Sequence, residues 1–487
     1  MDFAFDNSFH DSMEGFYAPA EAAKPSAPRL LIFNHALADR LGLDLASAGE
    51  DELGNLFSGD TLPPGAAPVA LAYAGHQFGH FSPQLGDGRA LLLGELVAPD
   101  GARFDLQLKG SGPTAFSRNG DGKAAIGPVL REYLVSEAMA AMGVPTTRSL
   151  AAVATGDRVQ RERGHPGAVL TRVASSHIRV GTFQFFAAHF GADHVAQLAT
   201  YSIRRHFPDL ADAPNPHLSL LDRVIGLQCE LVSRWLGVGF IHGVMNTDNV
   251  AISGETIDYG PCAFMDRFAV NTVFSSIDAN GRYAYGRQPQ ILHWNMARFA
   301  EALLPAIHSV DPADVEAAKA LVNEIPDRFG RVWSALMRQK LGLIEAREDD
   351  GELIDGLFDE LEKHQVDFTL FFRGLAMMLR GDGTRLESLL PNADAMVPWI
   401  ADWWERLGRD SDTPLERADA MDRVNPLYIP RNHKVEAALA SAEEGDMAPW
   451  LALLDVVQNP FAARAEWADY AVPAPDDFGP YTTFCGT

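Results

Sequence analysis

The hydrophobic pattern of this chain changes near residue 180, and the change limits the folds that the chain can adopt. Before that point, apolar residues recur in strand-sized runs such as 90–98 and 103–110, which a Pro-Asp-Gly turn separates. One strong helical pattern interrupts the strands at 127–143, with a proline near its start and a glycine at its end. Beyond residue 180, segment after segment carries apolar residues at helical spacing. The sequence therefore predicts an α+β protein whose first half is rich in strands and whose second half is mainly helical.

The order of these elements is typical of a bilobal, protein-kinase-like fold. Residues 66–178 are expected to form an N-lobe with a glycine-rich loop, a strand that ends in a lysine and one long helix. Residues 179–487 are expected to form an extended, mainly helical C-lobe, which carries a catalytic and metal loop at 240–262. Residues 1–65, with a helix-like piece near 30–43, are interpreted as an N-terminal extension.

The composition argues against several classes of protein. At 487 residues, with 47% hydrophobic and 22% charged residues, the chain can bury a large core in two or three packed units. Its net charge of −25 repels phosphate backbones, so nucleic acid is not an expected partner, although an anion can bind where a few basic residues converge. No apolar run is long enough to cross a bilayer and no secretory signal is visible, so we expect a cytoplasmic protein without a membrane partner. The three cysteines lack a CxxC motif or a Cys/His cluster, which argues against a disulfide scaffold and a zinc site.

The first candidate phosphate-binding loop is the stretch Gly86-Asp87-Gly88. Two glycines between apolar segments let the backbone turn tightly and approach a phosphate closely. The glycines alone are more typical of an ordinary turn, but Arg89 follows directly and favours an anion.

A second glycine-rich loop and an arginine pair are weaker candidates for the same role. Asp121 and Gly122 form a turn before Lys123, which by itself is typical of a surface loop. Arg172 and Arg179 stand seven residues apart in a segment that is otherwise apolar and small. Arginine suits fixed, multidentate contacts to phosphate, although such a pair is often only surface charge.

Lys109 ends the predicted strand 103–110, at a place comparable to that of the lysine that holds nucleotide phosphates in kinases. The alternative is a solvated lysine at a strand end. Glu132 and Glu137 on the following helix are candidates for the carboxylate that positions this lysine. They are five residues apart and face different directions, so only one can serve, and we favour Glu132.

The segment FIHGVMNTDNVAISGETIDYGP, residues 240–261, resembles the catalytic and metal-binding stretch of a kinase. Asn249 and Asp258 stand where kinases place the two oxygen ligands of Mg²⁺. Val244 stands where the general base of a kinase is expected, so the pattern lacks that base. Residues 249–253 and 255–260 are predicted to pair as a short hairpin.

Taken together, these motifs resemble those of the selenoprotein O (SelO/YdiU) family of protein adenylyltransferases. The resemblance covers nearly the whole chain and includes "LAYAGHQFGHFSPQLGDGRALLLGE", "LQLKGSGPTAFSRNGDGKAAIGPVLREYLVSEAM", "VLTRVASSHIRVGTFQFF" and "GFIHGVMNTDNVAISGETIDYGPCAFMD". It implies a kinase-like fold and transfer of AMP from ATP to serine, threonine or tyrosine hydroxyls of other proteins, with release of pyrophosphate. It also implies that ATP binds in the reverse orientation to that in kinases, so that its α-phosphate faces the acceptor.

The resemblance assigns roles residue by residue. Asn249 and Asp258 are implied to hold Mg²⁺ or Mn²⁺, and Glu132 is the expected support of the ATP lysine. The implied ATP-binding residues are Gly86, Gly88, Arg89, Lys109, Asp121, Gly122, Arg172, Arg179 and Asp258.

Asp248 is implied to be the catalytic base. With ATP reversed, a carboxylate at position 244 has no purpose, whereas Asp248 can lie near the metal and the α-phosphate and take a proton from the acceptor. The alternative for Asp248 is an aspartate that only stabilises a turn.

The resemblance also implies a redox pair, Cys262 with Cys485, which would link the C-terminal tail to the segment after Asp258. Two other functions stay open at this point: a kinase with an unusual base, and an inactive nucleotide-binding or redox-responsive scaffold. The target proteins, the preferred metal and the oligomeric state cannot be predicted from the sequence.

Overall fold

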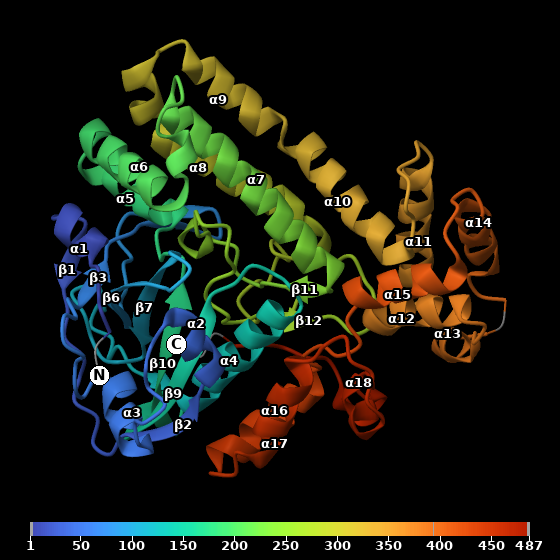
Figure 1. Cartoon of the computed structure of the whole chain (residues 1–487), viewed down its shortest axis with the longest axis horizontal. Helices are drawn as coiled ribbons and strands as arrows, with labels where there is room; N and C mark the ends of the chain where they lie inside the picture. The colour runs from blue at the N-terminus through green and yellow to red at the C-terminus, as the bar shows by residue number, and fades with distance from the viewer. Residues whose placement is uncertain (1–2, 393, 485–487) are drawn as a thin grey trace.

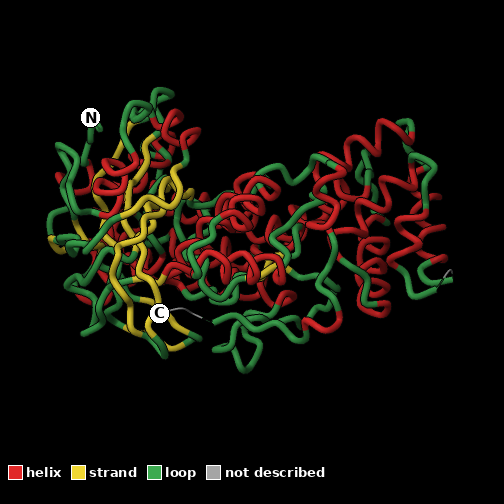
Figure 2. The backbone as a smooth tube through the Cα atoms, turned by 90° about the horizontal axis from the view of Figure 1, so that it is seen from below, coloured by secondary structure: helices red, strands yellow, loops and turns green. Residues whose placement is uncertain are grey.

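In a computed structural model, which describes residues 3–392 and 394–484, the chain is an α+β protein, as the sequence predicted. The strands gather at one end of the molecule and helices fill the other end (Figure 2). The last strand of the main sheet ends at Ala174, close to the predicted change of pattern. The kinase-like arrangement of lobes and the three predicted regions stay predictions.

The main sheet is antiparallel and has the strand order β1-β3-β6-β7-β10-β9-β2, with β8 paired to β10. The predicted turn at 99–101 does join β6 to β7: Ala98 N donates to Ala102 O, and Gly101 has a φ of +84°. The strands are β1 (Tyr17–Pro19), β2 (Arg29–Phe33), β3 (Val69–Leu71), β6 (Ala90–Val97), β7 (Arg103–Lys109), β8 (Ala124–Ala125), β9 (Arg148–Gln160) and β10 (Gly164–Ala174).

Strands β1 and β2 lie at the two edges of this sheet, so residues before 65 complete it on both sides. The helix predicted near 30–43 is wrong in its first part, because β2 pairs with β9 and only α2 (His35–Leu41) is helical there. Long-range pairing to β9 overrides the local pattern. Helices α2 and α3 (Glu50–Ser58) pack on one face of the sheet and form a separate apolar core with it; α1 (Ser8–Ser12) precedes them.

Helix α4 (Ile126–Ala141) is the predicted helix at 127–143, and it lies on the other face of the sheet. It contacts β9 and β10 on one side and α16 (Asn432–Glu443) and α17 (Ala448–Val457) on the other. Because it is covered on both sides, most of α4 is buried, including Glu132 and Glu137.

The second half is helical, as predicted. Helices α7 and α8 pack together, α10 lies against α7, and α11–α15 form a group at the end of the molecule farthest from the sheet (Figure 1). The helices after α4 not yet given are α5 (Val180–His189), α6 (Ala192–His206), α7 (Pro216–Gly237), α8 (Gln288–Val310), α9 (Asp314–Asn323), α10 (Ile325–Leu341), α11 (Asp350–His364), α12 (Phe368–Leu379), α13 (Thr384–Leu389), α14 (Val397–Leu407), α15 (Pro414–Val424) and α18 (Ala468–Ala471).

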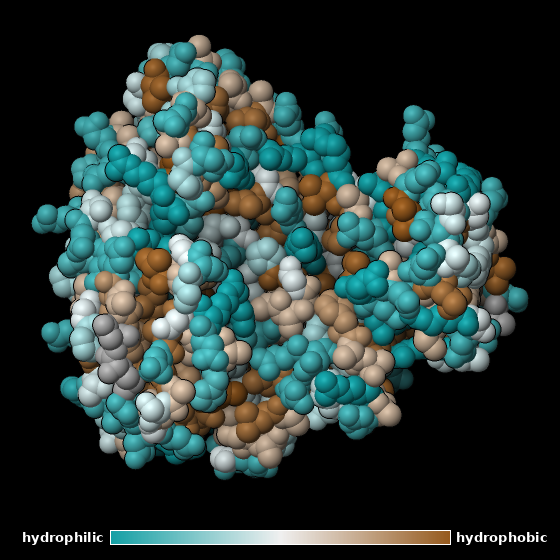
Figure 3. All heavy atoms as spheres, viewed as in Figure 1, coloured by the Kyte–Doolittle hydropathy of each residue, from teal (hydrophilic) through white to brown (hydrophobic). Residues whose placement is uncertain are grey.

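Hydrophilic residues cover most of the molecular face in Figure 3, and apolar side chains appear between them in smaller groups. Among the described residues, no helix combines the length and the hydrophobicity needed to span a membrane.

Candidate active site

A cavity of about 500 Å³ opens between the sheet, α4 and the segment 244–261. The residues that line it come from segments before and after residue 179 in the sequence, so residues far apart in the chain meet there. The structure brings every predicted catalytic, ATP-binding, metal-binding and supporting residue to this cavity: Gly86, Gly88, Arg89, Lys109, Asp121, Gly122, Glu132, Arg172, Arg179, Asp248, Asn249 and Asp258.

The segment that carries Asp248 and Asp258 is held at its base by a short ladder. Strand β11 (Phe240–Ile241) pairs with β12 (Ala263–Phe264), which brings the two ends of the loop together. The predicted hairpin of residues 249–260 is wrong: Ala251 bridges Arg179 and Thr256 bridges Thr146. The backbone partners of this stretch come from the first half of the chain, which no local pattern reveals.

Three cations converge on the carboxylate of Asp258. Lys109 Nζ lies 2.7 Å and Arg172 Nη1 2.6 Å from Oδ1, and Arg179 Nη1 lies 2.7 Å from Oδ2. Burial alone would raise the pKa of Asp258, but the charges of Lys109, Arg172 and Arg179 hold that pKa well below its usual range. The backbone of Asp258 has a φ of +63°, a conformation uncommon outside glycine and frequent at functional sites. One carboxylate thus faces three positive charges beside a cavity.

Lys109 pairs with Glu132, and the choice between the two glutamates on α4 is thereby decided. Lys109 Nζ donates to Glu132 Oε2 at 2.6 Å, and Glu132 Oε1 accepts from Arg172 Nη1 at 3.2 Å. Glu137 faces the other way and forms a bidentate pair with Arg148 at 2.8 and 2.7 Å. The two carboxylates therefore hold different cations, as expected for residues five positions apart on a helix.

The Gly86 turn does lie at the cavity wall, but its glycines also have a steric cause that the sequence did not indicate. A Cβ on Gly86, whose φ is +73°, would lie 2.2 Å from the ring of Phe116, and one on Gly88 would lie 2.8 Å from Phe116 O. Likewise a Cβ on Gly122 would lie 2.1 Å from Gly112 O. The Gly86 turn therefore packs against Phe116 and the Gly122 turn packs against Gly112, and contact to phosphate stays a prediction.

Arg89 and Asp121 differ in whether their side chains already have a charged partner. Arg89 has no ion-pair partner among the described residues, whereas Asp121 forms a bidentate pair with Arg161 at 2.8 and 3.1 Å. The hydrogen bonds to Arg161 lower the pKa of Asp121. Arg89 is therefore available to an anion, and Asp121 acts first as the partner of Arg161, which also lines the cavity.

Asp248 lies on the short helix η2 (Thr247–Asn249) and lines the cavity with a carboxylate that is only partly hydrogen-bonded. Gln77 Nε2 donates weakly to Oδ2 at 3.4 Å, and Oδ1 has no hydrogen-bond partner within the described part of the chain. Burial raises the pKa of Asp248 to about 6. A carboxylate that accepts few hydrogen bonds and has a pKa in that range is suited to accept a proton.

A hairpin of β4 (Gly75–Gln77) and β5 (His80–Ser82) covers the Asp248 segment. His76 N donates to Thr247 Oγ1 at 2.7 Å, and Phe78 N donates to Asn246 Oδ1 at 3.0 Å. A Cβ on Gly75 would lie 2.2 Å from Asp248 Oδ1, so only glycine permits this close approach. Sequence analysis missed this hairpin and Asn246, and the clearest local signal was the glycine-rich run AGHQFGH.

The oxygen donors near Asp258 fit a small hard cation. Asn249 Nδ2 donates to Val244 O at 3.0 Å, which fixes the amide, so its Oδ1 remains a possible ligand beside the Asp258 carboxylate. The described residues contain no cluster of three or more His, Cys, Asp or Glu side chains suited to a metal. Mg²⁺ typically takes one or two protein oxygens and completes its shell with water and substrate phosphates, and this donor set agrees with that preference.

The sequence also missed two buried polar residues behind the cations, Asp87 and Gln107. Strand β7 reads RFDLQLK, so Asp105, Gln107 and Lys109 share one face and leucines occupy the other. Such alternation usually indicates a solvated face, but here Asp105 and Gln107 are buried. The alternation of polar and apolar residues was the only local signal for this buried polar face. Its role becomes visible in the register with β10, which places Gln107 opposite Arg172.

Cys262 is buried and forms no disulfide with another cysteine that the structure describes, and burial raises the pKa of its thiol to about 11. Its predicted partner Cys485 lies outside the described residues. The tail reaches the neighbourhood of Cys262, because Thr483 Oγ1 donates to Pro261 O at 2.8 Å.

Comparison with known proteins gives the class of this enzyme. The chain is 79% identical over 487 residues to "Protein nucleotidyltransferase YdiU" of Sphingopyxis alaskensis, and each chain is covered completely. It is 54% identical over 489 residues to the protein of the same name from Cereibacter sphaeroides strain KD131, again over all of both chains. It is 55% identical over 474 residues to that of Chromobacterium violaceum, over 97% of this chain and 99% of the relative. The chain is therefore a nucleotidyltransferase.

The family is equally plain. The family described as "Protein adenylyltransferase SelO" matches residues 1–458. The chain belongs to this SelO family, as its motifs suggested.

Proposed function

We propose that this enzyme transfers AMP from ATP to serine, threonine or tyrosine hydroxyls of other proteins. The observation that carries the proposal is the convergence of Lys109, Arg172 and Arg179 at the cavity. The cavity around this cluster is lined by seven basic and five acidic side chains, so on a chain with a net charge of −25 it is a locally positive place that can attract a polyanion. A triphosphate meets that description.

We propose that ATP lies with its β- and γ-phosphates on these three cations and its α-phosphate toward Asp248. In the transfer step, the acceptor oxygen forms a bond to the α-phosphorus while the bond from that phosphorus to the bridging oxygen of the β-phosphate breaks. Pyrophosphate leaves with the electron pair of the broken bond, and the cations stabilise its charge. The hydroxyl proton goes to the carboxylate of Asp248, which lines the cavity and accepts only one weak side-chain hydrogen bond, from Gln77.

Val244 supports this orientation. It lines the cavity and supplies a carbonyl to Asn249, and it offers no proton acceptor at the position where a kinase keeps its base. Asp248, on the same segment, is the carboxylate that can take the proton from the acceptor hydroxyl instead.

Asn249 and Asp258 would hold Mg²⁺ or Mn²⁺ with the nucleotide bound. The ion would supply positive charge to the phosphate oxygens as a Lewis acid. We propose that residues 66–178 and 179–487 act as the two lobes of a kinase-like fold around this cavity, with residues 1–65 as an extension.

We propose in addition that Cys262 and Cys485 form a reversible disulfide that regulates the enzyme. The contact between Thr483 and Pro261 supports a tail that reaches this segment. If Cys485→Ser and the wild type respond identically to oxidant and reductant, this regulation does not exist.

The experiment that tests the function uses ATP labelled at the α- or the γ-phosphate with a mixture of cellular proteins. Label from α alone in protein supports adenylyl transfer. Label from γ supports a kinase, and label from neither supports an inactive scaffold. Asp248→Asn is the matched variant, because it keeps the shape of the side chain and removes the proton acceptor, and it should abolish transfer while ATP still binds.

A further inference from the structure

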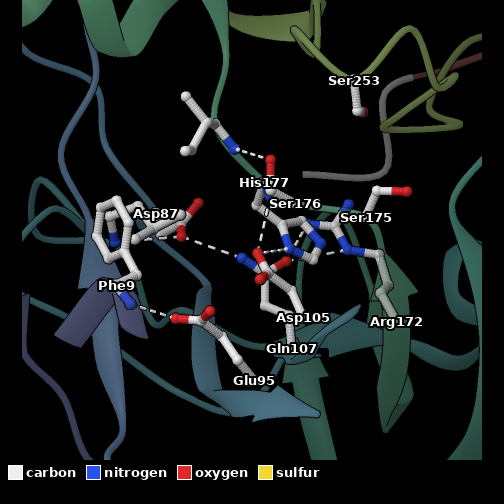
Figure 4. Close-up of polar contacts among 12 residues, drawn as sticks. Phe9, Asp87, Glu95, Asp105, Gln107, Arg172, Ser175, Ser176, His177 and Ser253 are labelled. Carbon is white, nitrogen blue, oxygen red and sulfur yellow. Dashed lines mark hydrogen bonds and ion pairs between the residues drawn. The ribbon is translucent and has the colours of Figure 1, made fainter. Parts of the chain in front are cut away.

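Two buried polar side chains contact the arginine pair: Gln107, which does not line the cavity, and Asp87, which lies at its wall. Gln107 on β7 is 0% exposed and Asp87, between the two glycines of its turn, is 2% exposed. Figure 4 shows Gln107 between Asp87 and Arg172. Burial of an amide and a carboxylate is costly unless both are hydrogen-bonded, so their contacts indicate what they do.

Gln107 joins Asp87 to Arg172 and has only one possible amide orientation. Its Oε1 accepts from Arg172 Nε at 3.1 Å and also from Arg172 Nη2, while its Nε2 donates to Asp87 Oδ2 at 3.1 Å. The amide oxygen must face the guanidinium donors and the amide nitrogen must face the carboxylate. Gln107 and Arg172 are paired residues of β7 and β10, which places both side chains on the same face of the sheet.

Asp87 serves the second arginine. Its Oδ1 lies 3.6 Å from Arg179 Nη2, and its Oδ2 also accepts from Leu71 N at 3.2 Å. The ring of Tyr73 lies 4.5 Å from the guanidinium carbon of Arg179. Arg179 is therefore held by one carboxylate and one aromatic face that do not depend on Asp258.

The contacts divide each guanidinium into two sides. Nη1 of Arg172 and Nη1 of Arg179 contact Asp258, whereas Arg172 Nε and Nη2 face Gln107 and Arg179 Nη2 faces Asp87. If Asp258 binds a metal ion, its carboxylate neutralises less of the charge of the two arginines. The contacts of Arg172 with Gln107 and of Arg179 with Asp87 would remain. Preorganised donors of this kind need no rearrangement when the anion arrives.

We propose that Asp87 and Gln107 are positioning residues that hold Arg172 and Arg179 for the β- and γ-phosphates of ATP. This inference rests on the proposed function. It predicts a selective effect: loss of Gln107 or Asp87 weakens binding of the triphosphate and leaves binding of AMP unchanged, because AMP lacks the phosphates that the arginines hold.

The test compares Gln107→Leu, Gln107→Glu and Asp87→Asn with the wild type. Gln107→Leu removes all three hydrogen bonds, so the dissociation constant of ATP should rise about tenfold, the size expected for one charge-assisted hydrogen bond. Gln107→Glu keeps an acceptor for Arg172 but sets a second carboxylate against Asp87 in place of the amide donor, so it should recover that affinity only in part. Asp87→Asn keeps the shape of the side chain and removes its charge, so it should also weaken ATP binding. It provides a second test of the proposal if the Gln107→Leu protein does not fold.

Thr171→Val is the matched control. Thr171 is fully buried on β10 beside Arg172, and its hydroxyl donates to Phe57 O on the opposite face of the sheet. The change removes one buried hydroxyl from the same sheet without touching the arginines. It should leave the affinity for ATP unchanged.

Calorimetric titration with ATP and with AMP, together with the KM for ATP and kcat, decides the matter. The inference holds if ATP affinity falls and KM rises in Gln107→Leu and Asp87→Asn while AMP affinity and kcat change little. It is overturned if ATP binds as in the wild type, or if ATP and AMP lose affinity equally, which would indicate a purely structural role. If the wild type itself binds no ATP or transfers no α-label, the proposed function fails instead.

Discussion

Two buried arginine clusters in this molecule differ in their ratio of charges and in their surroundings. At the cavity, Lys109, Arg172 and Arg179 converge on Asp258, and Glu132 and Asp87 also pair with them, so three cations meet three carboxylates. In the helical half, one cation meets two carboxylates: Arg431 is fully buried and lies 2.5 Å from Asp266 and 2.7 Å from Asp367.

The difference shows what distinguishes a ligand site from a structural ion pair. The Arg431 cluster has at least as many carboxylates as cations, is closed, and does not line the cavity. The three cations at Asp258 are balanced by Asp258, Glu132 and Asp87, but they face a cavity that is lined by seven basic and five acidic side chains. Buried charge alone therefore says little about function, whereas an excess of one charge around an open cavity favours a ligand of the opposite sign.

The largest expected effect is the loss of transfer in Asp258→Asn. This change removes the charge on which three cations converge and a proposed metal ligand together, so transfer of α-label should fall at least about a thousandfold. Circular dichroism and the thermal midpoint check that the protein still folds. Transfer at the wild-type rate by a folded Asp258→Asn protein would remove this cluster from the mechanism.

The next prediction contrasts the stability of the two clusters. Arg431→Met leaves the buried carboxylate of Asp367 and the partly exposed carboxylate of Asp266 without their cation and should lower the free energy of unfolding by about 3–5 kcal/mol. Arg172→Met leaves Asp258 with two other cations and mainly costs hydrogen bonds, about 1–2 kcal/mol. Urea unfolding of both variants measures the difference.

Equal destabilisation by Arg431→Met and Arg172→Met would show that the clusters are alike in stability. Arg431→Met should also bind ATP as the wild type does once folded, because Arg431 does not line the cavity.

The smallest expected effect concerns a third kind of buried cation. Lys340 is buried, donates to Asn425 Oδ1 at 2.6 Å and lies 4.0 Å from the ring centre of Phe372, with no carboxylate contact among the described residues. Burial lowers the pKa of Lys340 to about 7. Between pH 7 and pH 10.5 the unfolded chain binds more protons than the folded protein, so stability should rise with pH in that window.

Lys340→Met removes this dependence. Its free energy of unfolding should exceed that of the wild type at pH 6, by on the order of 1–2 kcal/mol, and the gap should shrink at pH 10. Urea unfolding at the two pH values measures it. A wild type whose stability does not change with pH relative to Lys340→Met would mean that Lys340 stays charged when folded.

The sequence predicted the α+β class, and the residues that its local motifs marked as a site lie together at one cavity, while their roles stay predictions. Asn249, Asp258 and Lys109 were identified from spacing and from the family resemblance, and all lie at one cavity. The sequence could not choose firmly between Glu132 and Glu137 as the partner of Lys109. The choice depends on Arg148, at the start of β9, which pairs with Glu137 and leaves Glu132 to Lys109.

The misses have a common physical cause, namely pairing between distant segments. Residues 249–260 form no hairpin because Ala251 and Thr256 bridge to Arg179 and Thr146. Gln107 gained its meaning only when the register of β7 and β10 placed it opposite Arg172. Local patterns give the faces of strands, and only the folded chain gives their neighbours.

The most direct test of the central claim is the difference in affinity between ATP and AMP, measured by calorimetric titration for the wild type and for Arg179→Met. If Lys109, Arg172 and Arg179 hold the β- and γ-phosphates, the wild type binds ATP at least about tenfold more tightly than AMP, and Arg179→Met loses most of that difference. Equal affinities of the wild type for ATP and AMP, or a difference that Arg179→Met retains in full, would contradict the account.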